Sequence, residues 1–137
     1  MRADECIFFQ MAKAAQKAVR FLTSKIEHLG ITAVQAMILN FLSEEDEITS
    51  NRLGERTLLD SATLTGILDR LEAHGFIERG QHPRDRRAIL ISLTPRGREL
   101  ATDIRKIAER SNREIFRNFS RDDEITFRNH LERIRKS

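Results

Sequence analysis

The chain has 137 residues, of which 39% are hydrophobic and 33% are charged, so it can bury one core and form one ordinary domain. Its single cysteine, Cys6, excludes an intramolecular disulfide framework and is typical of a reducing compartment. No run of about 18 apolar residues occurs, and the chain opens with MRADE rather than with a secretory start. We therefore expect a cytoplasmic protein that is neither exported nor embedded in a membrane.

Two helices are predicted in the first third of the chain. Apolar residues recur at helical spacing over 3–29, and Gly30 ends that helix. Thr32 and Gln35 form a capping box for a second helix through AVQAMILNFLS, which is apolar nearly all round and is therefore predicted to be central. The acidic run 44–47 then predicts a loop.

Two short helices joined by a tight turn are predicted next. Thr49 can cap a helix over 50–57. Asp60 or Ser61 can cap the following helix, which ends at Gly75, a residue well suited to the position after a helix.

A small hairpin follows this helix pair. The segments Ile77–Arg79 and Ala88–Leu93 predict paired strands, because apolar and polar residues alternate in the second of them. This alternation places Ile89, Ile91 and Leu93 on one face, which we expect to point toward the core.

Two more helices complete the chain. Thr94 before Pro95 is typical of a helix start, and that helix is predicted to run to about Phe119. Ser120 with Asp123 predicts a capping box for the last helix. With no linker or repeat, the sequence indicates a single domain, mainly α with a small β-hairpin.

The loop between the two predicted strands is strongly basic. Residues 79–87, RGQHPRDRR, contain four arginines and one histidine, whereas the net charge of the whole chain is only +3. Such a concentration of positive charge attracts polyanions, chiefly nucleic acid, although isolated runs of charged residues are often only solvated. The sequence alone leaves both interpretations open.

The second short helix has one apolar face and one small, polar face. Its predicted core residues are Leu64, Ile67, Leu68 and Leu71. Its opposite face carries small or hydroxyl-bearing residues near the N-terminal half: Ser61, Ala62, Thr63, Thr65 and Gly66. Such a face can approach base edges closely. Alternatively, its serine and threonine residues only cap the helix and contact solvent. Because an arginine-rich hairpin follows, the order of elements is that of a winged helix-turn-helix.

Three motifs together resemble the MarR family of bacterial transcriptional regulators: DSATLTGILDRLEAHGFIERG, the triplet DRR at 85–87, and the exit AILISLTPRG. The likeness covers nearly the whole chain. It implies a homodimeric repressor or activator with a winged helix-turn-helix lobe over about 32–94. The segments 1–30 and 95–137 would then be dimerisation helices.

The resemblance also implies roles for single residues. Ser61, Thr63 and Thr65 would lie in the major groove of double-stranded DNA, while Arg86 or Arg87 would enter the adjacent minor groove, where negative potential is concentrated. Asp85 would brace the hairpin, and a salt bridge between it and one arginine is expected. Arg84 and His82 would flank the tip and contact phosphates or the groove.

Further residues of the helix pair are candidates for contact with the DNA backbone. Asn51, Arg52 and Arg56 on the first helix could fix register without reading sequence, or could be ordinary exposed residues. Arg70 on the second helix could reach a phosphate, whereas Asp69 on the outward face would repel one.

Phenylalanines concentrate at both ends of the chain, and they have the character of an intertwined dimer interface or of intramolecular packing: Phe8, Phe9, Phe21, Phe116, Phe119 and Phe127. The resemblance favours a two-fold dimer, which predicts a pseudo-palindromic site. Many relatives bind small aromatic effectors, but no residue here identifies such a ligand.

Cys6 raises the alternative of a thiol-based redox regulator. Some relatives sense organic hydroperoxides through a cysteine of the N-terminal helix, and DSATLT resembles that subgroup. The tyrosines that orient the reactive cysteine there have no counterpart, because the chain contains no Tyr. Asp4 and Glu5 would also disfavour the thiolate, so we expect a structural cysteine.

No arrangement typical of an enzyme or a metal site occurs. The histidines His28, His74, His82 and His130 are scattered, and no catalytic or phosphate-loop motif is present. We expect a nucleoid-associated DNA-binding regulator without a cofactor. The rivals are a winged-helix module that binds protein or RNA and a purely structural dimer.

Overall fold

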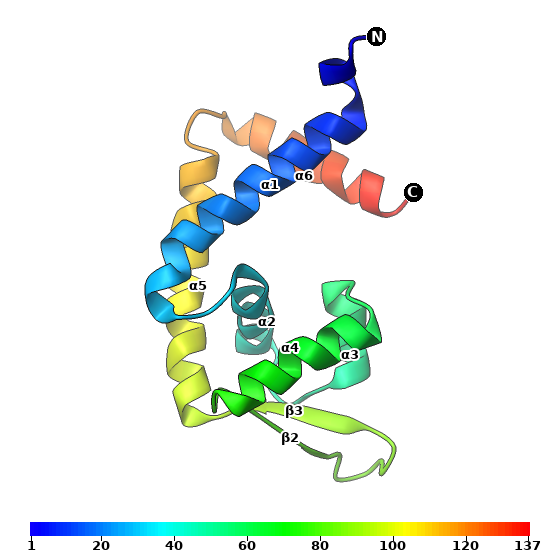
Figure 1. The fold of residues 1–137 in the computed structure, drawn as a ribbon, viewed down its shortest axis with the longest axis vertical. Coiled ribbons are helices and arrows are strands. Elements are labelled where there is room, and N and C mark those ends of the chain that lie inside the picture. Colours follow the sequence, from blue (N-terminus) through cyan, green and yellow to red (C-terminus); the bar gives the residue numbers. More distant parts are fainter.

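The computed structural model describes residues 1–137 and is mainly helical, with one small sheet, as predicted (Figure 1). The elements in chain order are a 3-10 turn Ala3–Glu5, α1 Ile7–Ile26, a 3-10 turn Glu27–Leu29, α2 Ala33–Glu44, β1 Ile48–Thr49, α3 Ser50–Thr57, α4 Ser61–Ala73, β2 Ile77–Gln81, β3 Ile89–Leu93, α5 Pro95–Ile115 and α6 Arg121–Arg135. A lobe of α2 to β3 lies at one end, and α1 and α6 lie at the other, with α5 joining the two ends.

The sheet has three antiparallel strands in the order β1-β3-β2. The hairpin register runs from Ile77 opposite Leu93 to Gln81 opposite Ile89. The strand β2 is therefore two residues longer than predicted, because Gly80 and Gln81 continue it, and β3 begins at Ile89 instead of Ala88. The two-residue strand β1, which pairs Ile48 with Ile91, was not predicted.

Side-chain caps fix the helix starts where the sequence predicts them. Thr32 and Gln35 form the full capping box of α2. Thr49 and Thr94 cap α3 and α5, each by accepting a backbone N–H three residues ahead. Asp60, and not Ser61, caps α4.

Three predictions about helix ends are wrong in detail. The helix expected over 3–29 is divided, because Cys6 has extended backbone angles and the last turn, 27–29, is a 3-10 turn closed by Gly30 at φ 72°. The helix α5 ends at Ile115 instead of Phe119, since Phe116 and Phe119 fold into a turn with their rings edge to face. Ser120 caps α6, but the reciprocal bond of a capping box is absent.

The core lies inside the lobe between α2, α4, the sheet and α5. The four predicted core residues of α4, from Leu64 to Leu71, are all buried, and so are Ile91 and Leu93. Ile89 is 49% exposed, because the hairpin has already left the core at that point, so the prediction that it faces the core is wrong. In α2, Val34 and Met37 are exposed, so that helix is central without being buried all round.

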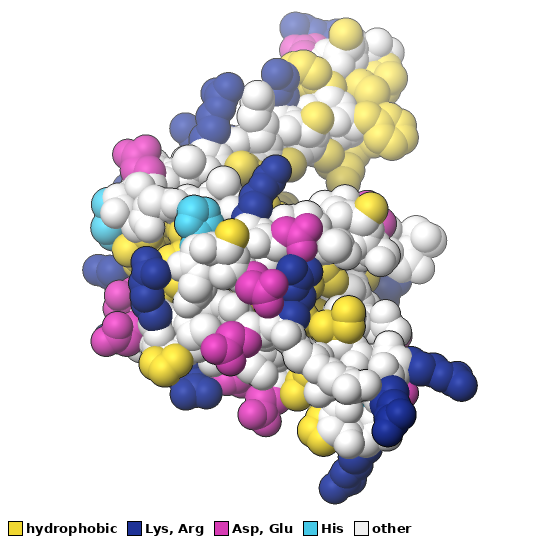
Figure 2. Space-filling view, turned by 60° about the horizontal axis from the view of Figure 1, so that its bottom comes forward, with side chains coloured by type: hydrophobic (Ala, Val, Ile, Leu, Met, Phe, Trp, Pro, Cys, Tyr) yellow, Lys and Arg dark blue, Asp and Glu magenta, His cyan; other side chains and the backbone are white.

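The two terminal helices leave their apolar residues in solvent. In α1 only Ile26 is buried, and α6 has no buried residue at all. Hydrophobic side chains gather over the far end of the molecule in Figure 2, and the exposed set of the two helices is Ile7, Phe8, Phe9, Met11, Val19, Ile125, Phe127, Leu131 and Ile134. No single helix is long and apolar enough to span a membrane, and α1 and α2 meet that test only as a pair bent by 79°.

Candidate nucleic-acid interface

The exposed N-terminal part of α4 is organised by hydrogen bonds within the helix. Asp60 Oδ1 accepts the backbone N–H of Thr63 at 2.8 Å, and Asp60 Oδ2 accepts the Thr63 hydroxyl at 2.9 Å. These bonds, the backbone one first, hold the pKa of Asp60 below its usual value. The Thr65 hydroxyl donates to the carbonyl oxygen of Ser61 at 2.8 Å, whereas the Ser61 hydroxyl has no partner within the chain. The result is a short row of oriented hydroxyl groups facing solvent.

Gly66 lies on the same helix and has no structural role that requires glycine. A Cβ atom added to it would meet nothing within 4 Å. Glycine in a helix interior costs roughly 0.5–1 kcal/mol relative to alanine, so the fold alone does not account for it. Ala62, one turn earlier, and Arg70, one turn later, are both exposed, and Arg70 forms no salt bridge.

The loop at the end of the hairpin, residues 82–88, is held by two side chains and is called the wing tip below. His82 Nδ1 accepts the backbone N–H groups of Arg84 and Asp85 at 3.1 and 3.2 Å, so the ring's remaining proton lies on Nε2. Asp85 Oδ1 accepts the backbone N–H of Arg87 at 3.0 Å. The expected salt bridge between Asp85 and an arginine is absent, and the carboxylate binds the Arg87 backbone N–H instead.

Three arginines of the wing tip have no acidic partner. Arg84, Arg86 and Arg87 are exposed and form no salt bridge, and dark-blue side chains project from this corner of the molecule in Figure 2. Their charge is therefore available to an external anion. The fourth arginine of the basic segment, Arg79, differs because it is paired with acidic residues of α4.

Arg79 ties the hairpin to α4. Its guanidinium lies 2.7 Å from Asp69 Oδ1 and 2.9 Å from Glu72 Oε1, and its backbone N–H donates to Glu72 Oε2 at 2.9 Å. The bonds with Arg79 lower the pKa of Glu72, and the bonds with Glu72 raise the pKa of Arg79. This group, the Arg79 clamp, holds α4 and the wing tip in one orientation.

The Arg79 clamp corrects two expectations. Arg79 does not contribute free charge to the tip, and Asp69 is paired with it rather than left to repel a phosphate. The sequence could not reveal this pairing, because the partners lie on opposite sides of the turn at Gly75 and meet only when β2 folds back along α4.

The helix α3 offers less to an anion than its sequence indicates. Arg52 Nε lies 2.8 Å from Glu45 Oε1, and Arg56 pairs with both Glu45 and Glu44 at 2.9 Å. The pKa of Glu45 is lowered, first by its hydrogen bond with Arg52. Both arginines are thus directed at the end of α2. Asn51 remains exposed and lines a small hollow between α3 and α4 with Ser61 and Thr65 among its neighbours.

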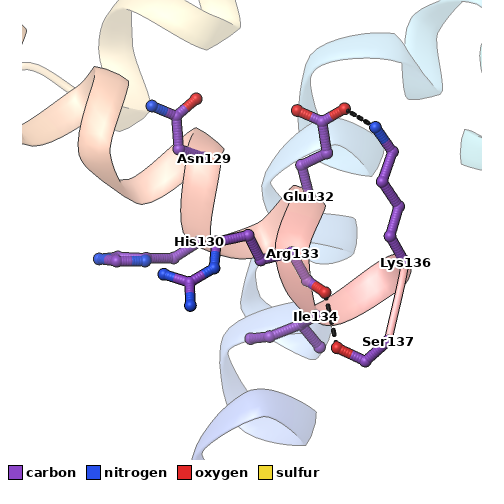
Figure 3. A pocket seen from close by; sticks show the side chains of 7 residues that line it. All are labelled: Asn129, His130, Glu132, Arg133, Ile134, Lys136 and Ser137. Carbon is purple, nitrogen blue, oxygen red and sulfur yellow. Dashed lines mark hydrogen bonds and ion pairs between the residues drawn. The ribbon is translucent and has the colours of Figure 1, made fainter.

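Two other features carry no ligand chemistry of their own. Cys6 is half-buried at the start of α1, and no group of three or more His, Cys, Asp or Glu side chains is placed to hold a metal ion. A shallow hollow lies against the end of α6 (Figure 3). Ile134 is its only hydrophobic residue, and Lys136 is paired with Glu132 at 2.6 Å.

Comparison with known sequences identifies the family. Residues 29–88 match the sequence model of the MarR family. The organic hydroperoxide resistance transcriptional regulator of Bacillus subtilis strain 168 is 34% identical over 107 residues, which cover 76% of this chain and 73% of that protein. The chain belongs to the MarR family.

Solved structures agree with this assignment. A probable transcriptional regulator from Pseudomonas aeruginosa, 32% identical, superposes with a TM-score of 0.89 over 97% of this chain and 99% of its own. A mutant of MarR from E. coli, solved in complex with operator DNA and 26% identical, superposes with a TM-score of 0.87 over 98% of this chain and 99% of its own. This MarR-family chain is a winged helix-turn-helix, DNA-binding transcriptional regulator, as the sequence predicts.

Proposed function

We propose that this MarR-family protein is a homodimeric repressor that binds a pseudo-palindromic operator through α4 and the wing tip. The observation that carries the proposal is the group of three unpaired arginines on a braced wing tip, which the Arg79 clamp fixes relative to the hydroxyl row of α4. A preformed pair of contact elements loses little conformational freedom on binding.

The two elements act on different parts of the duplex. Ser61, Thr63 and Thr65 approach base edges in the major groove, with Ala62 and Gly66 leaving room for close contact. Arg86 or Arg87 enters the minor groove, which concentrates negative potential where it is narrow. Phosphates are contacted by Arg84, Arg70, Asn51 and the Nε2–H of His82. Arg52 contributes less, because Glu45 already neutralises it.

The terminal helices form the interface of the proposed dimer. Residues 32–94 form the DNA-binding lobe of each copy, and residues 1–30 and 95–137 pair the two copies through the exposed apolar residues of α1 and α6. A two-fold axis then presents two identical lobes to two half-sites about one helical turn apart. Release by a small effector, expected from the family, remains a prediction without an identified ligand.

We propose no redox-sensing role for Cys6. One observation favours such a role: the Bacillus subtilis relative is named for organic hydroperoxide resistance. The absence of any tyrosine in this chain removes the residues that the redox-sensing relatives use to orient their cysteine.

Selection from a library of duplexes, followed by affinity measurement against salt, tests the proposal. We expect wild type to enrich a symmetric motif, and Arg86→Ala or Arg87→Ala to weaken binding to it by about 1–3 kcal/mol. Arg52→Ala is the matched control in the same lobe, because it removes an arginine that is already paired, and it should have a much smaller effect. If no motif emerges and the wing variants bind like wild type, a protein or RNA partner becomes the better explanation.

Gly66→Ala should separate folding from DNA binding. The substitution meets no atom within 4 Å, so the free energy of unfolding should rise by roughly 0.5–1 kcal/mol. Operator affinity should fall, since the added methyl group occupies space that α4 needs beside the base edges. Denaturant unfolding and operator titration of the same preparation measure both effects. Unchanged affinity would place Gly66 outside the DNA contact.

A further inference from the structure

Hydrogen bonds inside the chain determine which groups α4 can offer to a base. A threonine hydroxyl has one proton, so a hydroxyl that donates within the protein can only accept from a ligand. Thr63 donates to Asp60 Oδ2 at 2.9 Å, and Thr65 donates to the carbonyl oxygen of Ser61 at 2.8 Å. Both side chains are exposed, so each presents outward an oxygen lone pair and a methyl group.

Asp60 holds the Thr63 proton inward. Its Oδ1 is occupied by the Thr63 backbone N–H at 2.8 Å, which leaves Oδ2 for the hydroxyl. These bonds lower the pKa of Asp60, so the carboxylate stays ionised and has no proton to give back. The Thr63 hydroxyl therefore cannot reverse its direction without losing this bond.

Such groups discriminate between base pairs in the major groove. Adenine N6 and cytosine N4 are hydrogen-bond donors, guanine O6 and N7 are acceptors, and thymine carries a methyl group. An oxygen that can only accept attracts an amino group and repels guanine O6. An A·T pair offers an amino group to that oxygen and the thymine methyl group to the threonine methyl. A G·C pair offers the cytosine amino group but no methyl group, and its guanine presents two acceptors that repel the oxygen.

We infer that Thr63 and Thr65 read A·T pairs, and that Asp60 is a specificity-determining residue that acts by orienting the Thr63 hydroxyl. The inference rests on the proposed operator binding and adds the class of base that each threonine recognises. Ser61 differs from both, because its hydroxyl has no partner within the chain and can still donate to guanine or thymine.

Asp60→Asn reverses the hydrogen bond and so tests the inference. Asparagine is as good an N-cap as aspartate, so its Oδ1 should still accept the Thr63 N–H. Its amide nitrogen then donates to the Thr63 oxygen, and the hydroxyl proton is free to point outward. Duplex selection with Asp60→Asn should shift the preference at one base pair of each half-site from adenine toward guanine by about tenfold, with the rest of the motif unchanged.

Two further variants separate the effect of charge from the effect of the Thr63 hydroxyl. Glu55→Gln removes one negative charge from an exposed position of α3 without changing a hydrogen bond of α4, and it should leave every base preference as in wild type. Thr63→Val keeps the shape of the side chain and the backbone bond to Asp60, and it should lower the preference for adenine at the same base pair by about fivefold.

The outcomes separate this inference from the proposed function. A wild-type motif that Asp60→Asn leaves unchanged at every position would overturn the inference while operator binding stands. A uniform change of affinity that Glu55→Gln reproduces would do the same, because charge alone would explain it. If wild type selects no motif, the proposed function fails, and the inference fails with it.

Discussion

Phe8→Glu should convert the proposed dimer into a monomer and weaken operator binding by about 100-fold or more. Phe8 is 79% exposed and lies on α1, where apolar residues face solvent over most of the helix length. In a two-fold dimer one substitution places two carboxylates in the apolar interface, where burial of an unpaired charge is expensive. A monomer binds only one half-site. It therefore loses the gain in affinity from binding two half-sites at once, which is on the order of 10²–10⁴.

Sedimentation measures the mass and a duplex titration measures the affinity. The matched control is Leu58→Glu, which puts the same charge on a leucine that is 69% exposed at the end of α3, in the lobe of α2 to β3. This variant should keep the mass of wild type. Far-UV circular dichroism should be unchanged for Phe8→Glu, because no core residue packs on it. A dimer that survives the substitution would show that the N-terminal end of α1 lies outside the interface.

The starts of α2, α3 and α5 were predictable because the signals for them are local. A cap at Thr32, Thr49 or Thr94 needs only the backbone three residues ahead, so the chain carries the whole signal within one helical turn. The buried face of α4 was predictable for the same reason, since helical spacing alone brings its apolar residues together.

The electrostatics of the interface were not predictable, because they depend on which elements meet. Arg79 counts as part of a basic loop in the sequence, yet the fold pairs it with Asp69 and Glu72. Arg52 is neutralised by Glu45, which precedes it by seven residues and lies just after the end of α2. The imidazole of His82 is also used inside the loop, to accept two backbone N–H groups. The partners of Arg79 and Arg52 are set by tertiary packing, and those of His82 by the conformation of the loop.

Gly97→Ala should destabilise the protein by about 3 kcal/mol, the largest effect on folding that we expect from an alanine substitution at a glycine of this chain. Gly97 is buried in the first turn of α5, against the turn that leads into β2. A Cβ atom there would overlap the carbonyl oxygen of Phe76 and lie 2.9 Å from its carbonyl carbon. The obstacle is backbone, so no side chain can rotate to relieve it.

The backbone around Gly97 also cannot shift freely. The Thr94 N–H donates to the same Phe76 oxygen at 3.1 Å, and the Thr94 hydroxyl donates to the carbonyl oxygen of Gly75 at 2.7 Å. Moving α5 away from the methyl group would stretch these bonds and separate the lobe of α2 to β3 from α5. Thermal unfolding at fixed protein concentration should show a decrease in Tm of roughly 10 °C. Gly66→Ala, the same change in another helix, should raise Tm instead, since its added methyl group meets no atom. Equal shifts for the two variants would mean that helix propensity outweighs the contact with Phe76.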